Sequence, residues 1–140
     1  MKWMVISVRN EQREAPVSVA QTARLARRAV RQLRIRMRGT LAITFIDTRR
    51  MRALNRRFLR HDRPTDVLSF RYHRESVVGD ILISPSAARA YARANGLKYA
   101  DELSRYVVHG LLHWTGQNDQ TPAQRRTMWR REDHILEVCG

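Results

Sequence analysis

Residues 67–84 read VLSFRYHRESVVGDILIS, and this stretch decides the fold because it places two predicted strands one after the other. Residues 67–71 and 80–84 are short apolar runs, which are typical of strands bounded by turn residues. The segment between them, from Tyr72 to Val78, predicts a turn. Ser84 and Pro85 then supply a favourable N-cap and a favourable first-turn residue, so a helix is expected to begin there.

Before residue 67 the sequence predicts strands and helices in alternation, and after residue 84 it predicts helices alone. Strands are predicted at residues 3–8 and 41–46, and helices at 17–33, 47–58, 85–95, 99–115 and 122–138. The order β-α-β-α-β-β-α-α-α indicates the α+β class. We therefore expect one domain over residues 1–140, with a four-stranded mixed sheet and about five helices packed on it.

Charge is the strongest feature of the composition. The 140 residues include 27 Lys and Arg against 13 Asp and Glu, which gives a formal net charge of +14. Lys2 and Lys98 are the only lysines, so nearly all of this charge is arginine. Guanidinium groups bind phosphate oxygens in pairs and stack on bases, which favours a nucleic acid partner. Solvated helix faces, such as the arginines between residues 24 and 34, are the alternative interpretation.

The sequence also indicates where the protein works. Cys139 is the only cysteine, so no internal disulfide is expected, as is usual in a reducing compartment. The apolar runs are far shorter than the roughly 18 residues of a membrane span, and the first residues lack a signal-peptide pattern. A cytoplasmic protein without membrane contact is expected.

The residues that carry chemistry lie at 109–119, HGLLHWTGQND. His109 and His113 are four residues apart in a predicted helix, so they project from one face, one turn apart. Gly116 permits a sharp turn after the helix, which brings Asp119 back toward both histidines. Two imidazoles and a carboxylate can hold one divalent ion, and zinc accepts all three donors. This spacing predicts a metal site formed by His109, His113 and Asp119.

Each of these residues also has a simpler interpretation. Two histidines at this spacing occur on helices without any ligand role, and Asp119 can instead cap the helix that follows it. The spacing is close to the H-E-x-x-H-x-x-G-x-x-H layout of metallopeptidases, with Asp119 in place of the third histidine. However, Gly110 stands where those enzymes have their general-base glutamate, so peptide hydrolysis is not expected.

Residues 109–119 resemble the motif H-G-x-L-H-L-x-G-Y-D-H of the YbeY family, which comprises bacterial metal-dependent endoribonucleases of ribosomal RNA maturation. Residues 54–70, LNRRFLRHDRPTDVLSF, resemble the family block L-N-x-x-[FY]-R-x-x-D-x-P-T-D-V-L-S-F. Residues 79–84, GDILIS, match a third block, G-D-I-x-I-S. The three blocks follow the order of the family and cover most of residues 41–137.

The resemblance implies a zincin-like site on a helix, where His109, His113 and Asp119 hold one divalent ion, most simply Zn²⁺, and act through it in catalysis. It also implies a single-strand-specific endoribonuclease for 3′-end maturation of small-subunit ribosomal RNA and for ribosome quality control. The implied partners are ribosomal RNA and the small ribosomal subunit with its proteins.

The candidate substrate-binding residues lie in and after the loop that precedes residue 67, and they are Arg60, His61, Arg63 and Ser69. For the three loop residues a solvated charge is the alternative, and for Ser69 a structural role in the strand. Two positions depart from the family pattern: Asp119 replaces its third histidine, and Leu59 replaces an arginine that Arg60 follows by one place. These departures keep a second hypothesis open, a ribosome-assembly or RNA-binding factor with a structural metal and little or no cleavage.

Overall fold

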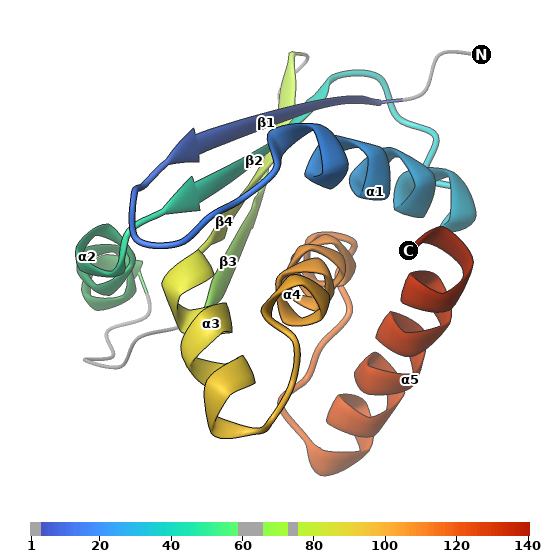
Figure 1. The fold of residues 1–140 in the computed structure, drawn as a ribbon. Coiled ribbons are helices and arrows are strands. Elements are labelled where there is room, and N and C mark those ends of the chain that lie inside the picture. The colour runs from blue at the N-terminus through green and yellow to red at the C-terminus, as the bar shows by residue number, and fades with distance from the viewer. Residues whose placement is uncertain (1–3, 59–65, 73–75) are drawn as a thin grey trace.

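The computed structural model describes residues 4–58, 66–72 and 76–140. The elements in these residues are β1 (Val5–Glu11), α1 (Val19–Gln32), β2 (Thr40–Ile46), α2 (Thr48–Phe58), β3 (Val67–Arg71), β4 (Val77–Ile83), α3 (Pro85–Ala94), α4 (Tyr99–Trp114) and α5 (Pro122–Cys139). This order confirms the predicted α+β class, with four strands and five helices in the described part of the chain (Figure 1).

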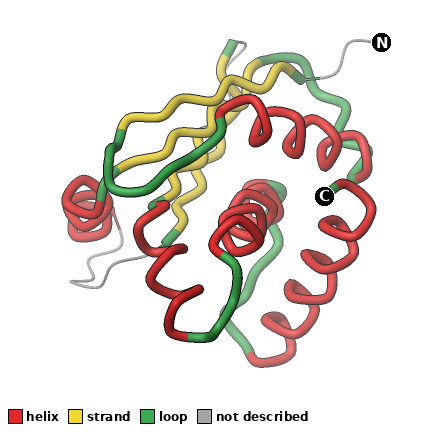
Figure 2. Tube along the Cα trace, viewed as in Figure 1, coloured by secondary structure: helices red, strands yellow, loops and turns green. Residues whose placement is uncertain are grey.

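The four strands form one mixed sheet in the order β1-β2-β4-β3, seen as a single yellow layer in Figure 2. β2 pairs with β1 and with β4 in parallel, while β3 and β4 are antiparallel. Parallel neighbours need a long crossover, which α1 provides between β1 and β2. β3 and β4 are close in sequence, so the chain can reverse directly between them. The mixed character of the sheet is therefore a consequence of the element order.

Two strands are longer than their apolar patterns predict. β1 continues beyond residue 8 to Glu11, which pairs with Ile46, and β4 begins before residue 80 at Val77, which pairs with Thr40. Main-chain hydrogen bonding to the neighbouring β2 extends both strands into polar or turn-like sequence. Apolar alternation reports which side chains are buried, whereas strand length depends on the partner strand.

Helices cover both faces of the sheet, but unequally. α1 and α4 pack on one face, and α3 and α5 pack against α4 (Figure 1). Ile81 and Ile83 of β4 belong to this main core, while Leu82 between them contacts a smaller cluster that includes Met51 of α2. Successive strand residues point to opposite faces, so α2 covers the other side of the sheet. α4 is thereby enclosed by the sheet and by other helices.

The predicted helix boundaries agree closely with the structure. The Ser84 side chain accepts a hydrogen bond from a backbone N–H in the first turn of α3, which confirms it as the N-cap, and Thr121 does the same for α5. α4 ends just before Gly116, whose φ of +105° lies in the region that glycine tolerates best. Among the described residues, none of the helices is both long and apolar enough to cross a bilayer.

Candidate metal centre

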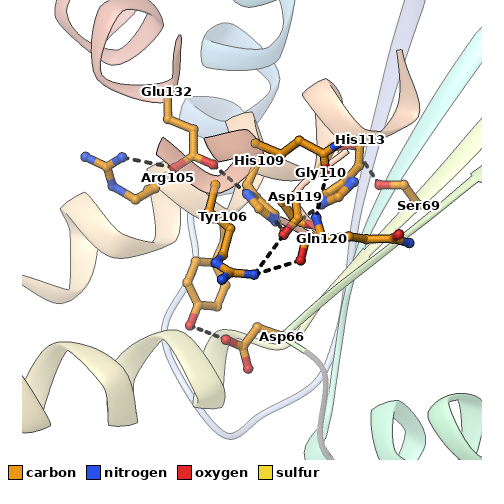
Figure 3. A network of polar contacts seen from close by, with 12 residues as sticks. Asp66, Ser69, Arg105, Tyr106, His109, Gly110, His113, Asp119, Gln120 and Glu132 are labelled. Atoms are coloured by element: carbon orange, nitrogen blue, oxygen red, sulfur yellow. Dashed lines mark hydrogen bonds and ion pairs between the residues drawn. The ribbon is translucent and has the colours of Figure 1, made fainter. Parts of the chain in front are cut away.

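The structure brings the three predicted ligands together at the end of α4 (Figure 3). Oδ2 of Asp119 lies 3.2 Å from Nε2 of His113 and 3.5 Å from Nε2 of His109. Ligands at about 2.0–2.1 Å from a tetrahedral zinc ion are about 3.3 Å from one another. The donor set and its spacing therefore fit a single divalent ion. Each of these side chains is about 30% exposed, so a bound ion would face solvent on one side.

The chain after α4 places Asp119 by means of its own hydrogen bonds. The N–H of Gly116 donates to the carbonyl of His113, which closes the last turn of the helix. Arg125 donates from Nη1 to the carbonyl oxygens of Asp119 and Gln120, at 3.4 and 3.0 Å. Thr121 is the N-cap of α5, so the alternative in which Asp119 caps that helix is wrong. The carboxylate of Asp119 faces the two histidines instead.

Glu132 of α5 orients His109, and sequence reasoning missed it. Nδ1 of His109 lies 2.5 Å from Oε2 of Glu132, whose side chain is only 3% exposed. A buried carboxylate at this distance holds a proton on Nδ1, which leaves the Nε2 lone pair free to face Asp119. A carboxylate that positions a metal-binding histidine in this way is common in metal sites. Glu132 lies on the apolar stripe of α5, between Met128 and Ile135, and this position in the sequence could have indicated a buried carboxylate.

Arg105 of α4 holds Glu132 in place and was also missed. Its guanidinium donates to Oε1 of Glu132 at 3.0 Å and to Asp133. Burial lowers the pKa of Arg105, but the hydrogen bonds to Asp133 and Glu132 outweigh this effect and raise it. Arg105 therefore stays charged and balances the buried carboxylate. Arg105 and Glu132 thus support His109 from outside the three predicted ligands, and they join α4 to α5.

Gly110 excludes the peptidase interpretation on steric grounds. A Cβ atom at this position would lie 2.5 Å from Cγ2 of Ile81 and 2.9 Å from Cγ1 of Val67. The hydroxyl of Ser69 donates to the Gly110 carbonyl at 2.7 Å, which ties α4 to β3 at the same place. A glutamate cannot occupy residue 110 unless the Ile81 and Val67 side chains shift. The glycine after His109 is therefore a packing requirement of this fold.

Replacing Gly110 with alanine is expected to lower the free energy of unfolding by about 1–2 kcal/mol. Overpacking costs about 1–3 kcal/mol, while alanine regains up to about 1 kcal/mol of helix propensity. Urea denaturation followed by circular dichroism measures the difference. Ala90→Gly, at an exposed position inside α3, is the control for helix propensity alone. A Gly110→Ala protein as stable as the parent would show that the sheet yields at this contact.

The metal centre opens into a cleft of about 620 Å³ between β3, α3, α4 and α5. Tyr106 forms part of its wall and donates its hydroxyl to Oδ2 of Asp66 at 2.8 Å. Burial and then the charge of Asp66 raise the pKa of Tyr106, so the phenol remains a donor at neutral pH. This hydrogen bond connects α4 to the residue that precedes β3. A ligand that entered the cleft would meet the three predicted metal ligands, which form part of its lining.

The candidate substrate contacts are only partly visible. Ser69 lines the cleft, but its hydroxyl is already bonded to the Gly110 carbonyl. Arg60, His61 and Arg63 lie outside the described residues, so the structure does not place them. Substrate binding by these four residues stays a prediction. Trp114, which follows His113 on α4, is 2% exposed and donates to the Val78 carbonyl, so it belongs to the core rather than to the cleft.

Comparison with known proteins identifies the family. The family model described as Endoribonuclease YbeY matches residues 7–140. The chain belongs to the YbeY family. Curated relatives named Endoribonuclease YbeY include proteins from Rhodopirellula baltica (39% identical over 107 residues, 74% of this chain and 55% of the relative), Anaeromyxobacter dehalogenans (35% over 127 residues, 81% and 66%) and Geobacillus kaustophilus (36% over 113 residues, 71% and 72%). The chain thus spans 55% and 66% of the length of the first two relatives.

A solved structure supports the fold independently. The solution structure of a Thermotoga maritima protein matches with a TM-score of 0.65 at 24% identity, over 95% of this chain and 87% of that one. At this identity the likeness shows the fold alone. The overall arrangement of sheet and helices is therefore shared with a structure of distant sequence.

Proposed function

We propose that this YbeY family member is a metal-dependent endoribonuclease consisting of one domain over residues 1–140. The observation that carries the proposal is the cluster of His109, His113 and Asp119 in the lining of an open cleft. The family match supplies RNA as the substrate class, and the net charge of +14 favours a polyanion. Within that class we propose single-stranded RNA, and 3′-end maturation of small-subunit ribosomal RNA with ribosome quality control as the cytoplasmic role.

The chemistry follows from what the residues can hold. A divalent ion, for which we propose zinc, would stabilise negative charge on the phosphate and lower the pKa of a water molecule. Nε2 of both histidines and the carboxylate of Asp119 would bind it, leaving a position open toward the cleft. Glu132 keeps the proton of His109 on Nδ1, so that Nε2 remains available as a ligand.

Asp119 gives the site a different charge from a three-histidine site. Its carboxylate adds one negative charge beside the ion, so bound water would be less acidic than among three neutral imidazoles. It also suits harder ions such as Mn²⁺ better than a third imidazole does. We therefore propose that this chain is also active when Mn²⁺ replaces zinc.

The test is RNA cleavage by protein with a measured zinc content. We expect a single-stranded RNA oligomer to be cut, and the same oligomer annealed to its complement to be cut more slowly. Asp119→Ala, purified identically, controls for contaminating nuclease and should be inactive. Intact RNA after incubation with fully metal-loaded parent protein would overturn the proposal. Equal cleavage by the parent and by Asp119→Ala would assign the activity to a contaminant.

A further inference from the structure

Two exposed aromatic rings line the cleft that contains the metal centre. Trp129 of α5 is 48% exposed and Tyr91 of α3 is 41% exposed, and both contribute to its walls. Five other large apolar side chains are exposed in the described part of the chain, and none of them lines this cleft. α3 and α5 flank α4 on opposite sides in Figure 1. Tyr91 and Trp129 therefore line the cleft from helices on either side of α4.

Trp129 is held in position by the same guanidinium that supports the metal centre. Cζ of Arg105 lies 4.2 Å from the centre of the indole ring, a cation–π contact on one face. Arg105 is itself fixed by hydrogen bonds to Glu132 and Asp133. A ring that is already ordered loses little conformational entropy when a ligand stacks on it. Contacts thus run without a break from His109 through Glu132 and Arg105 to Trp129.

Among the described residues that line the cleft, few groups can bind phosphate. Four carboxylates line it against two guanidiniums. Arg105 is paired with Glu132 and Asp133, whereas Arg125 donates to two backbone carbonyls and has no carboxylate partner among the described residues. Of the described lining residues, Arg125 and the three predicted metal ligands, through a bound ion, are the groups that could hold a phosphate. The base of a nucleotide, in contrast, is uncharged and can stack on an aromatic ring whatever its sequence.

We propose that Trp129 is a stacking platform for an unpaired base of the RNA substrate, with Tyr91 of α3 as a second ring. This inference rests on the proposed ribonuclease function and adds the residues that select single strands. Only an unpaired base presents a free ring face to such a platform, because both faces are covered inside a duplex. Stacking beside the cluster would place the neighbouring phosphate next to the ligands.

The experiment compares two oligomers with zinc-loaded protein. One is a fluorescently labelled single-stranded RNA, and the other has the same backbone with abasic positions in place of its bases. Dissociation constants are measured by anisotropy at low temperature, and gels run afterwards verify that the RNA is intact. The variants are Trp129→Ala, Trp129→Phe and Tyr91→Ala. Leu97→Ala is the matched control, because Leu97 is 47% exposed but does not line the cleft.

If bases stack on Trp129, replacing this residue should lower RNA affinity only when the RNA carries its bases. Trp129→Ala should weaken binding of the normal RNA by about fivefold or more, while leaving the abasic oligomer within about twofold of the parent. Trp129→Phe should recover most of the affinity, Tyr91→Ala should show a smaller loss of the same kind, and Leu97→Ala should bind like the parent. Equal losses for both oligomers, or parental affinity of Trp129→Ala for the normal RNA, would overturn the inference. Failure of the parent to cleave RNA would instead count against the proposed function.

Discussion

Asp119→Ala is expected to remove most of the metal that the parent protein carries, from about one ion per chain to a small fraction. The aspartate provides one of three protein ligands and the only negative charge among them. Two imidazoles one helical turn apart remain, and they bind a divalent ion far more weakly. The loss of metal affinity should exceed the roughly 10–100-fold that is usual when a residue supporting a ligand is replaced. RNA cleavage should fall with the metal content.

Metal content per chain is measured by plasma emission spectroscopy on proteins purified identically. Asp101→Ala is the matched control, because it removes the same charge from an exposed position in the first turn of α4. A parent protein without metal after incubation with zinc would contradict the prediction. Direct contacts between Asp119 and the two imidazoles would then account for the cluster.

The same variant distinguishes a catalytic metal from a structural one. A catalytic metal predicts that Asp119→Ala folds with nearly the parental melting temperature and loses cleavage. An RNA-binding assembly factor with a structural metal predicts the reverse, a lower melting temperature with RNA affinity unchanged. The partial exposure of all three ligands favours the first outcome, because structural sites are usually closed by a fourth protein ligand.

Glu132→Ala is expected to weaken metal binding by about 10–100-fold although Glu132 touches no metal. Without its carboxylate, His109 loses the acceptor that fixes the proton on Nδ1 and sets the orientation of the ring. Arg105 keeps Asp133 as a partner, so the guanidinium is not left without a carboxylate. Competition with a zinc-binding dye gives the dissociation constant, and circular dichroism verifies the fold.

Asp133→Ala is the matched control for this prediction. It removes the other carboxylate bonded to Arg105, at an exposed position that leaves the contact between His109 and Glu132 intact. Metal affinity should stay within about threefold of the parent, below the range expected for Glu132. Glu132→Gln keeps the side-chain volume if the alanine variant folds poorly. Parental zinc affinity in a folded Glu132 variant would rule out a role in orienting His109.

The sequence by itself determined the features that depend on near neighbours. The four-residue spacing of His109 and His113 fixes one helix face, and Gly116 permits the turn that returns Asp119 to it. Capping by Ser84 is likewise local, because the side chain bonds to the first turn of its own helix. Alternation of strand and helix was sufficient for the fold class. These predictions are confirmed because backbone geometry links each pattern to a single local structure.

Only the tertiary structure decided the contacts between elements. The helical pattern of α5 places Glu132 on the buried stripe, yet it does not say which side chain of α4 the carboxylate meets. That contact depends on how the two helices pack, as does the stacking of Arg105 on Trp129. The start of β4 at Val77 depends on its pairing with β2. Packing joins residues that are distant in sequence, and both partners set the energy of each contact. No local sequence pattern therefore encodes these contacts.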